Sequence, residues 1–246
     1  RVATVKSVIN SAESLTKYSN GFIQTTIIDA VGEWQNDLEE IKRKKINIIS
    51  LNNSSIFKKF SKRGFIRSRI AYWFIFFSCF KPLIKLLKKE KPDYLIIHLI
   101  TSLPMIVFTI FNLNTKLILR ISGFPKLNFF RKLIWNLVKK KVNLVFCPTI
   151  ATTNYIKNLN FFENKNVYLL RDPIIKVREI VIKKNSNSNI ETIKNKNYLL
   201  SIGRLTRQKN FLFLIDCFNE IANLIKDLDL IIIGEGEEKK KILSKI

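Results

Sequence analysis

Short apolar runs alternate along the chain with longer stretches in which apolar residues recur every three or four positions. The runs predict strands at residues 22–28, 46–51, 94–97, 116–121, 143–147, 167–170, 198–202 and 228–233. The longer stretches predict helices at residues 35–45, 65–89, 103–111, 129–140, 151–158 and 211–225. Strands that alternate with helices in this way are typical of parallel sheets built from βαβ units, so we expect an α/β fold.

This pattern stops between residues 173 and 197, where the sequence is polar and has no periodicity. Such a stretch predicts a linker between two sheet domains, one at residues 1–172 and one at 198–246. The chain opens in a helical pattern and stops at Ile246 inside another one. We therefore expect a piece of a longer protein, in which the first strand of the first domain is missing and the second domain is incomplete.

Lysine and arginine outnumber the acidic residues by 43 to 19, which gives a formal net charge of +24. This charge favours polyanions, so nucleic acid, anionic lipid and nucleotide-sugar phosphates are all admissible partners. An AT-rich coding bias would produce the same wealth of lysine without any functional meaning. A nucleic-acid binder is the least favoured of these alternatives, because the sequence lacks an RNP-like aromatic motif, a zinc knuckle and a base-reading basic helix.

The cysteines and the single histidine argue against a metal site. Cys79, Cys147 and Cys217 lie far apart in apolar runs, and His98 is the only histidine. Buried free thiols suit a reducing cytoplasm.

A cationic turn separates the strand at 198–202 from the helix that starts near Phe211. Gly203 ends the strand, and Arg204 and Lys209 follow within the turn. In a βαβ unit this turn lies at the carboxyl edge of the sheet, where open α/β sheets bind ligands. Two cations beside the positive end of a helix dipole predict a diphosphate site. The alternative is a solvated turn that carries two cations by composition alone.

The next strand of this sheet ends in Gly234-Glu235-Gly236, where Glu235 either touches donor hydroxyls or is an ordinary exposed carboxylate. In the first domain, Asp29 and Glu33 are further carboxylates that follow a strand. Apart from this location, nothing in the sequence indicates that they are catalytic.

Three strand ends of the first domain carry candidate ligand contacts. His98 either holds a sugar hydroxyl or shuttles a proton, or it is structural. Arg120, close to Gly123, can bind an acceptor phosphate through two hydrogen bonds, or it forms a salt bridge at a domain interface. Thr149 precedes a predicted helix, and its side chain either caps this helix or contacts a ligand.

The predicted helix at 65–89 has an apolar centre from Ile70 to Phe80. Eleven helical residues cover about 16 Å, roughly half of the ~30 Å hydrocarbon thickness of a bilayer, so this centre does not span a membrane. Cations flank it, namely Arg67, Arg69, Lys81, Lys85 and Lys88. Aromatics between cations suit a helix that lies at an anionic membrane surface. The alternative is a helix buried between the sheet and its neighbours, with lysine stems over the rim.

Five segments stand in a recognisable order. They are Lys91 to His98, Lys140 to Thr149, Arg171 to Ile174, Ile202 to Leu205 with Gln208 to Asn210, and Gly234 to Gly236. The fourth segment matches a G-R-L-x-x-x-K-N signature and is the most specific. Together they resemble the retaining glycosyltransferases of family 4, and the resemblance covers most of the chain. It implies the GT-B fold, an α/β architecture in which two Rossmann-like parallel-sheet domains face a cleft.

The resemblance also implies an enzyme that moves a sugar from a nucleotide diphosphate sugar to an acceptor with retention. Arg204 and Lys209 would neutralise the departing diphosphate, Gly203 would let the backbone approach the phosphates, and Gly234 and Glu235 would border the nucleotide pocket. The first domain would hold the acceptor. No metal or other cofactor is expected, because two cations can stabilise the leaving group.

We expect a cell-surface or lipid-linked glycan acceptor, as in polysaccharide or lipopolysaccharide biosynthesis, and a cytoplasmic enzyme at the inner face of the inner membrane. The family's glycine-rich turn and its paired glutamates would fall outside residues 1–246, so this piece alone is expected to be inactive. A non-catalytic GT-B-like module is the remaining alternative.

Overall fold

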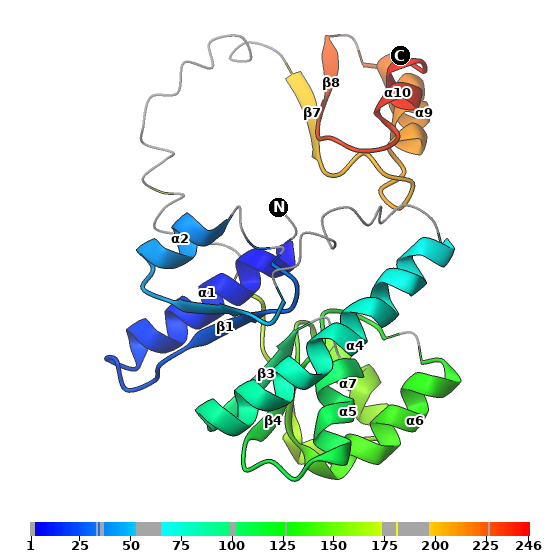
Figure 1. Ribbon diagram of the computed structural model, residues 1–246. Coiled ribbons are helices and arrows are strands. Elements are labelled where there is room, and N and C mark those ends of the chain that lie inside the picture. The colour runs from blue at the N-terminus through cyan, green and yellow to red at the C-terminus, as the bar shows by residue number, and fades with distance from the viewer. Residues whose placement is uncertain are drawn as a thin grey trace. The chain divides into compact units, whose positions relative to one another are not determined.

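The chain divides into two compact units, Arg1–Lys176 and Val177–Ile246 (Figure 1). The computed structural model describes residues 3–32, 34, 37–52, 65–98, 102–125, 127–173, 181, 197–225 and 227–246. The division falls within the predicted linker at 173–197, most of which lies outside the described residues. The assignment of residues 1–172 and 198–246 to an acceptor domain and a nucleotide-sugar domain stays a prediction.

The first unit opens with a small parallel sheet. Helix α1 (Ala3–Tyr18) precedes strand β1 (Thr26–Asp29), and helix α2 (Leu38–Arg43) leads to strand β2 (Asn47–Ser50). The two strands pair in parallel from Thr26↔Asn47 to Asp29↔Ser50. Buried apolar residues from α1, β1, α2 and the position before β2 form one cluster, namely Ile9, Ala12, Ile27, Ile41 and Ile46.

A four-stranded parallel sheet of order β3-β4-β5-β6 forms the rest of the unit. Its strands are β3 (Tyr94–His98), β4 (Lys116–Arg120), β5 (Val142–Cys147) and β6 (Val167–Leu169). The connecting helices are α5 (Ser102–Ile110), α6 (Phe129–Val138) and α7 (Ile150–Asn158). Short 3-10 turns, η2 (Lys139–Lys141) and η3 (Asn164–Asn166), precede β5 and β6. Because the strands are parallel, His98, Arg120 and Cys147 all lie at the carboxyl edge.

The 26-residue helix α4 (Phe65–Glu90) joins the two sheets of the first unit. One face of it, with Phe76, Cys79, Leu83 and Leu87, is buried in the main apolar core. The thiol of Cys79 donates to the carbonyl of Ala30 over 3.1 Å, which ties α4 to the end of β1. Within the described part of the chain, no helix has both the length and the apolar character needed to cross a membrane.

The second unit contains a two-stranded parallel sheet of β7 (Asn197–Ile202) and β8 (Leu228–Ile233). Helix α9 (Phe211–Ala222) connects the strands, and α10 (Lys239–Leu243) follows β8. Leu205, Phe211, Ile215 and Ile242 form its buried cluster. Leu205, which follows Arg204, is the most buried residue between Gly203 and α9. Its side chain fixes this loop to the apolar cluster.

The predicted order of elements is correct, and the differences lie at boundaries. The predicted strand 22–28 begins only at Thr26, because Asn20 and Gly21 adopt positive φ angles of 53° and 81° and Phe22 is 93% exposed. The predicted helix 129–140 ends at Val138 and continues as a 3-10 turn, and the helix 211–225 ends at Ala222.

Candidate functional site

The loops after β7 and β8 are joined by backbone hydrogen bonds. The amide of Gly203 donates to the carbonyl of Ile233, and the amide of Leu205 donates to the carbonyl of Glu235, both over 3.0 Å. The carbonyl of Leu205 accepts in turn from the amide of Glu238, also over 3.0 Å. The two predicted motifs of the second unit are thus brought together at the carboxyl edge of one sheet.

Two glycines in this pair of loops are required by close backbone contacts. A Cβ on residue 234 would overlap the carbonyl oxygen of Gly203, and one on residue 236 would overlap the carbonyl of Leu205. At Gly203 a Cβ would lie 3.3 Å from the ring of Phe211. The packing of the two loops therefore accounts for glycine at 234 without a ligand, and its role in the nucleotide pocket stays a prediction.

Arg204 and Lys209 both have exposed side chains in the loop between β7 and α9. Among the described residues, neither forms an ion pair. A turn precedes α9, in which the amide of Lys209 donates to the carbonyl of Thr206 over 2.9 Å. Asn210, the N-cap residue of α9, has a φ of 53° and makes no side-chain capping bond. Two cations without a carboxylate partner in the described part of the chain thus lie beside a helix start that has no side-chain cap, which is a suitable environment for an anion.

Glu235 has its own partner on the second loop. Its carboxylate accepts from the ammonium of Lys239 over 2.8 Å, and its side chain is 79% exposed. The structure thus shows Glu235 as an exposed loop carboxylate, and its contact with donor hydroxyls stays a prediction.

In the first unit, Arg120 is bound by Asp172. The guanidinium donates to Oδ1 of Asp172 from Nη2 over 2.5 Å and from Nε over 3.1 Å, and it also donates to the carbonyl of Arg171 over 3.3 Å. Arg120 is 7% exposed. The predicted salt bridge therefore exists, but it lies within the first unit rather than at a domain interface. A phosphate at Arg120 would have to compete with Asp172, so its role toward an acceptor stays a prediction.

His98 pairs with Arg120 in the register of β3 and β4. Burial and, to a smaller extent, the positive charge of Arg120 lower the pKa of His98 to about 4, although the carboxylate of Asp172 acts in the opposite direction. The imidazole is therefore neutral at neutral pH. A neutral imidazole can still hold a hydroxyl by a hydrogen bond, but a group with this pKa is poorly matched to proton transfer near neutrality.

The remaining predicted residues of the first unit have structural explanations. Thr149 caps α7, because its Oγ1 accepts from the amide of Thr152 and the Thr152 hydroxyl accepts from the amide of Thr149, which makes a capping box. Gly123 has open space where a Cβ would lie, so packing does not require glycine there. Ligand contacts at these two positions stay predictions.

The carboxylate of Asp29 shapes the loop after β1. It accepts from the amides of Val31, Gly32 and Trp34 over 3.1 to 3.2 Å. Glu33, the other carboxylate considered there, lies outside the described residues. Within the described ranges, no group of three or more His, Cys, Asp or Glu side chains could hold a metal ion.

Three residues that organise this edge, Asp172, Ser7 and Asn10, were missed by sequence reasoning. Asp172 holds Arg120, and the hydroxyl of Ser7 in α1 donates to the same carboxylate over 3.1 Å. The side-chain Nδ2 of Asn10 donates to the carbonyl of Pro173 over 2.6 Å. The available signal was a carboxylate directly after a strand in a region poor in acidic residues. Nothing local marked Ser7, which lies 165 positions away from its partner.

Comparisons with known proteins bear on these loops. Residues 183–246 match the family described as glycosyl transferases group 1. An uncharacterized glycosyltransferase of Methanocaldococcus jannaschii is 27% identical over 180 residues, which is 65% of this chain and 43% of that protein. The amylovoran biosynthesis glycosyltransferase AmsD of Erwinia amylovora is 32% identical over 111 residues, which is 42% of this chain and 30% of that protein. The chain thus spans less than half the length of these curated relatives.

Among solved structures, a glycosyltransferase from Rickettsia africae has a similar fold. The TM-score is 0.52 at 14% sequence identity, and the match covers 99% of this chain and 66% of that one. The predicted fold class, α/β with parallel sheets of the GT-B type, is confirmed, while the predicted cleft between the domains stays a prediction. Residues 183–246 are thus similar to glycosyl transferases group 1, and both curated relatives carry the name glycosyltransferase.

Proposed function

We propose that this chain is part of a retaining glycosyltransferase of family 4, which transfers a sugar from a nucleotide diphosphate sugar to a cell-surface or lipid-linked glycan. The observation that carries the proposal is the cationic loop of the second unit. Arg204 and Lys209 lie in the segment 183–246 that matches glycosyl transferases group 1, and both are exposed without an ion-pair partner among the described residues.

The loop also has the rigidity that such a site needs. Leu205 lies between the two cations in sequence, is 5% exposed, and is held on its amide and its carbonyl by the loop after β8. Fixed cations stabilise charge that develops on a departing diphosphate without having to reorganise during the reaction. In this proposal Arg204 binds the phosphate oxygens in a bidentate manner, and Lys209 acts as a point charge.

These two cations supply the electrostatic role that a divalent metal could have, so the proposal includes no cofactor. On the acceptor side, neutral His98 is proposed to hold a sugar hydroxyl through its ring nitrogens. Its pKa of about 4 makes it a hydrogen-bonding group rather than a general base at neutral pH.

Nucleoside diphosphate binding tests the proposal, measured by calorimetry near physiological salt. Arg204→Ala and Lys209→Ala are each expected to weaken binding by about tenfold or more, the scale of a lost charge-assisted contact. Arg207→Ala is the matched control, because Arg207 is an exposed cation of the same loop at a variable position of the signature. Its loss is expected to change binding less than about twofold, since only screened, longer-range charge is removed.

Equal losses for all three variants would mean that net charge alone attracts the nucleotide, and would contradict the proposed site. Unchanged binding in both Arg204→Ala and Lys209→Ala would contradict it as well. Transfer itself is measured with the full-length protein and a panel of nucleotide diphosphate sugars, where the stereochemistry of the product decides retention.

A further inference from the structure

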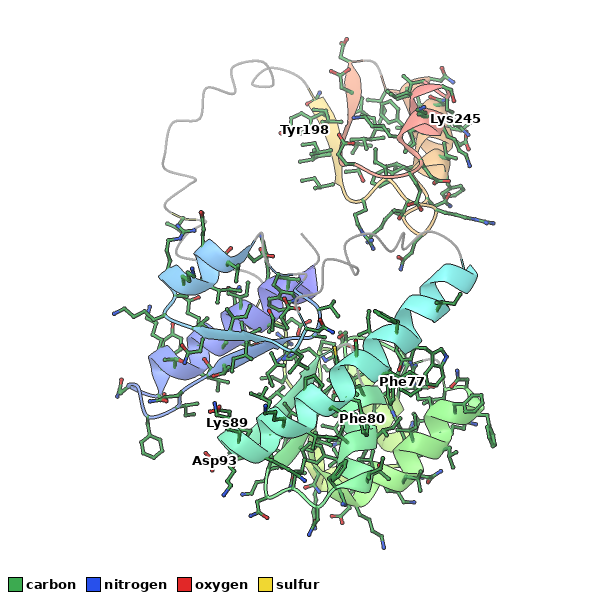
Figure 2. The ribbon with its side chains drawn as sticks, viewed as in Figure 1. Phe77, Phe80, Lys89, Asp93, Tyr198 and Lys245 are labelled. Atoms are coloured by element: carbon green, nitrogen blue, oxygen red, sulfur yellow. The ribbon has the colours of Figure 1, made fainter. Side chains whose placement is uncertain are left out.

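Helix α4 is amphipathic in an unusual way, because its exposed face is aromatic over the first half. Ile70, Trp73 and Phe77 are 56%, 55% and 69% exposed (Figure 2 labels Phe77). The same stripe continues at helical spacing with Lys81, Lys85 and Lys88, which are all exposed. The helix thus has one face in the core. Its exposed face carries a stripe that is apolar in the first half of the helix and basic in the second half.

Helix α6 has an outer stripe of the same kind. Trp135 and Val138 on its inner face are buried in the main apolar core. Its outer face carries large apolar residues, namely Phe129, Phe130, Leu133 and Leu137, with exposures of 75%, 72%, 47% and 58%. A surface helix normally has polar residues on this side. The basic turn η2 (Lys139–Lys141) follows directly, so this stripe is also apolar first and basic afterwards.

The two apolar stripes lie toward the same edge of the sheet. Helix α6 follows β4, so its first residues lie at the carboxyl edge of the β3–β6 sheet. Helix α4 ends just before β3 begins, so its last residues lie toward the amino edge and its earlier ones toward the carboxyl edge. The hydrogen bond from the hydroxyl of Tyr72 to Ser102 at the start of α5 agrees with this direction. Helix α5 packs against both α4 and α6 (Figure 1).

The charge on this layer is predominantly positive. In the sequence of α4, α5, α6 and η2 the single acidic residue is Glu90, and it pairs with Lys89 over 3.2 Å. Exposed aromatics surrounded by cations complement a surface that is anionic outside and apolar beneath. A second copy of the same face would instead bring lysines against lysines, which disfavours self-association.

We propose that the outer stripes of α4 and α6 form one surface that docks the first unit on an anionic lipid bilayer, with the carboxyl edge of the β3–β6 sheet turned toward the membrane. The aromatic halves enter the interface, and the lysines at the other ends of the stripes meet lipid phosphates. The inference goes beyond the proposed function, because it concerns a surface in the first unit and would hold whatever reaction the protein performs.

Vesicle flotation of the whole chain tests the docking without any measurement of transferase activity. We expect binding to vesicles of equimolar phosphatidylglycerol and phosphatidylcholine, and much weaker binding to phosphatidylcholine alone. Phe77→Ser and Phe130→Ser are each expected to reduce partitioning by about tenfold. Lys85→Gln is expected to reduce it by about fivefold. The matched control is Phe213→Ser, because Phe213 is 62% exposed on α9 in the second unit. Its partitioning should not change.

Tryptophan reporters test the orientation. In a Trp73→Phe background, with the signal of the remaining Trp34 and Trp135 subtracted, Phe130→Trp should be quenched by brominated lipids more strongly than Leu137→Trp, because residue 130 lies nearer the carboxyl edge. Circular dichroism confirms that each variant is folded. Equal binding to neutral and anionic vesicles, or an effect of Phe213→Ser as large as that of Phe130→Ser, would overturn the proposal. So would sedimentation showing that Phe77 and Phe130 mediate a dimer that does not bind vesicles.

Discussion

The carbonyl oxygen of Gly203 occupies the space in which a side chain on residue 234 would lie. Only glycine at 234 lets the loops after β7 and β8 approach closely enough for the amide of Gly203 to donate to the carbonyl of Ile233. The geometry of the cationic loop therefore depends on a residue in the neighbouring loop.

Gly234→Ala is expected to destabilise the chain by about 1–3 kcal/mol, the usual cost of overpacking, because backbone atoms have to move. Urea denaturation measures the change. Gly123→Ala is the control, since open space lies around Gly123 and its substitution should stay within about 0.5 kcal/mol. If the two variants were equally stable, the close approach of the two loops would be in doubt.

Asp172 is expected to act on both stability and the ionisation of His98. Asp172→Asn leaves the guanidinium of Arg120, which is 7% exposed, without its charged partner, and should cost about 2 kcal/mol or more. The carboxylate of Asp172 raises the pKa of His98, so its removal should lower that pKa below about 4. Arg120→Gln should shift the pKa in the opposite direction. NMR titration of the single histidine distinguishes these outcomes, and shifts of the same sign in both variants would refute the network.

His98 should also make stability depend on pH. Its pKa is lowered from 6.5 to about 4 on folding, so between these values the unfolded chain binds more protons than the folded one. The contribution is complete above pH 6.5 and is lost as the pH falls toward 4, by up to about 3 kcal/mol. Urea midpoints measured across this range should fall less steeply in His98→Asn, where only the carboxylates still titrate. Parallel pH profiles would show that the histidine is not buried in this way.

The capping box at the start of α7 predicts a modest and specific loss. Thr149→Ala removes the oxygen that accepts from the amide of Thr152, and should cost about 1 kcal/mol. Thr149→Ser keeps this oxygen and should be close to wild type. A Thr149→Ser variant as unstable as Thr149→Ala would assign the effect to the methyl group and its packing instead.

Much of the fold follows from local patterns. Apolar runs located β3 to β8 to within a residue or two, because the strands of parallel sheets typically consist of several consecutive apolar residues. The strand predicted at 22–28 was the least accurate, since Phe22 is apolar but has no sheet to join before Thr26. Helical spacing likewise located α4 from Phe65 to Glu90, one residue longer than expected.

For the site, the sequence by itself determined that Gly203, Arg204 and Lys209 lie in one turn between a strand and a helix, because all three are neighbours along the chain. Only the tertiary structure decided that Asp172 binds both Arg120 and Ser7, and that the carbonyl of Gly203 leaves no room for a side chain at residue 234. These partners are separated by tens of residues or more, and no periodicity records which distant side chains the packing of helices on a sheet brings into contact.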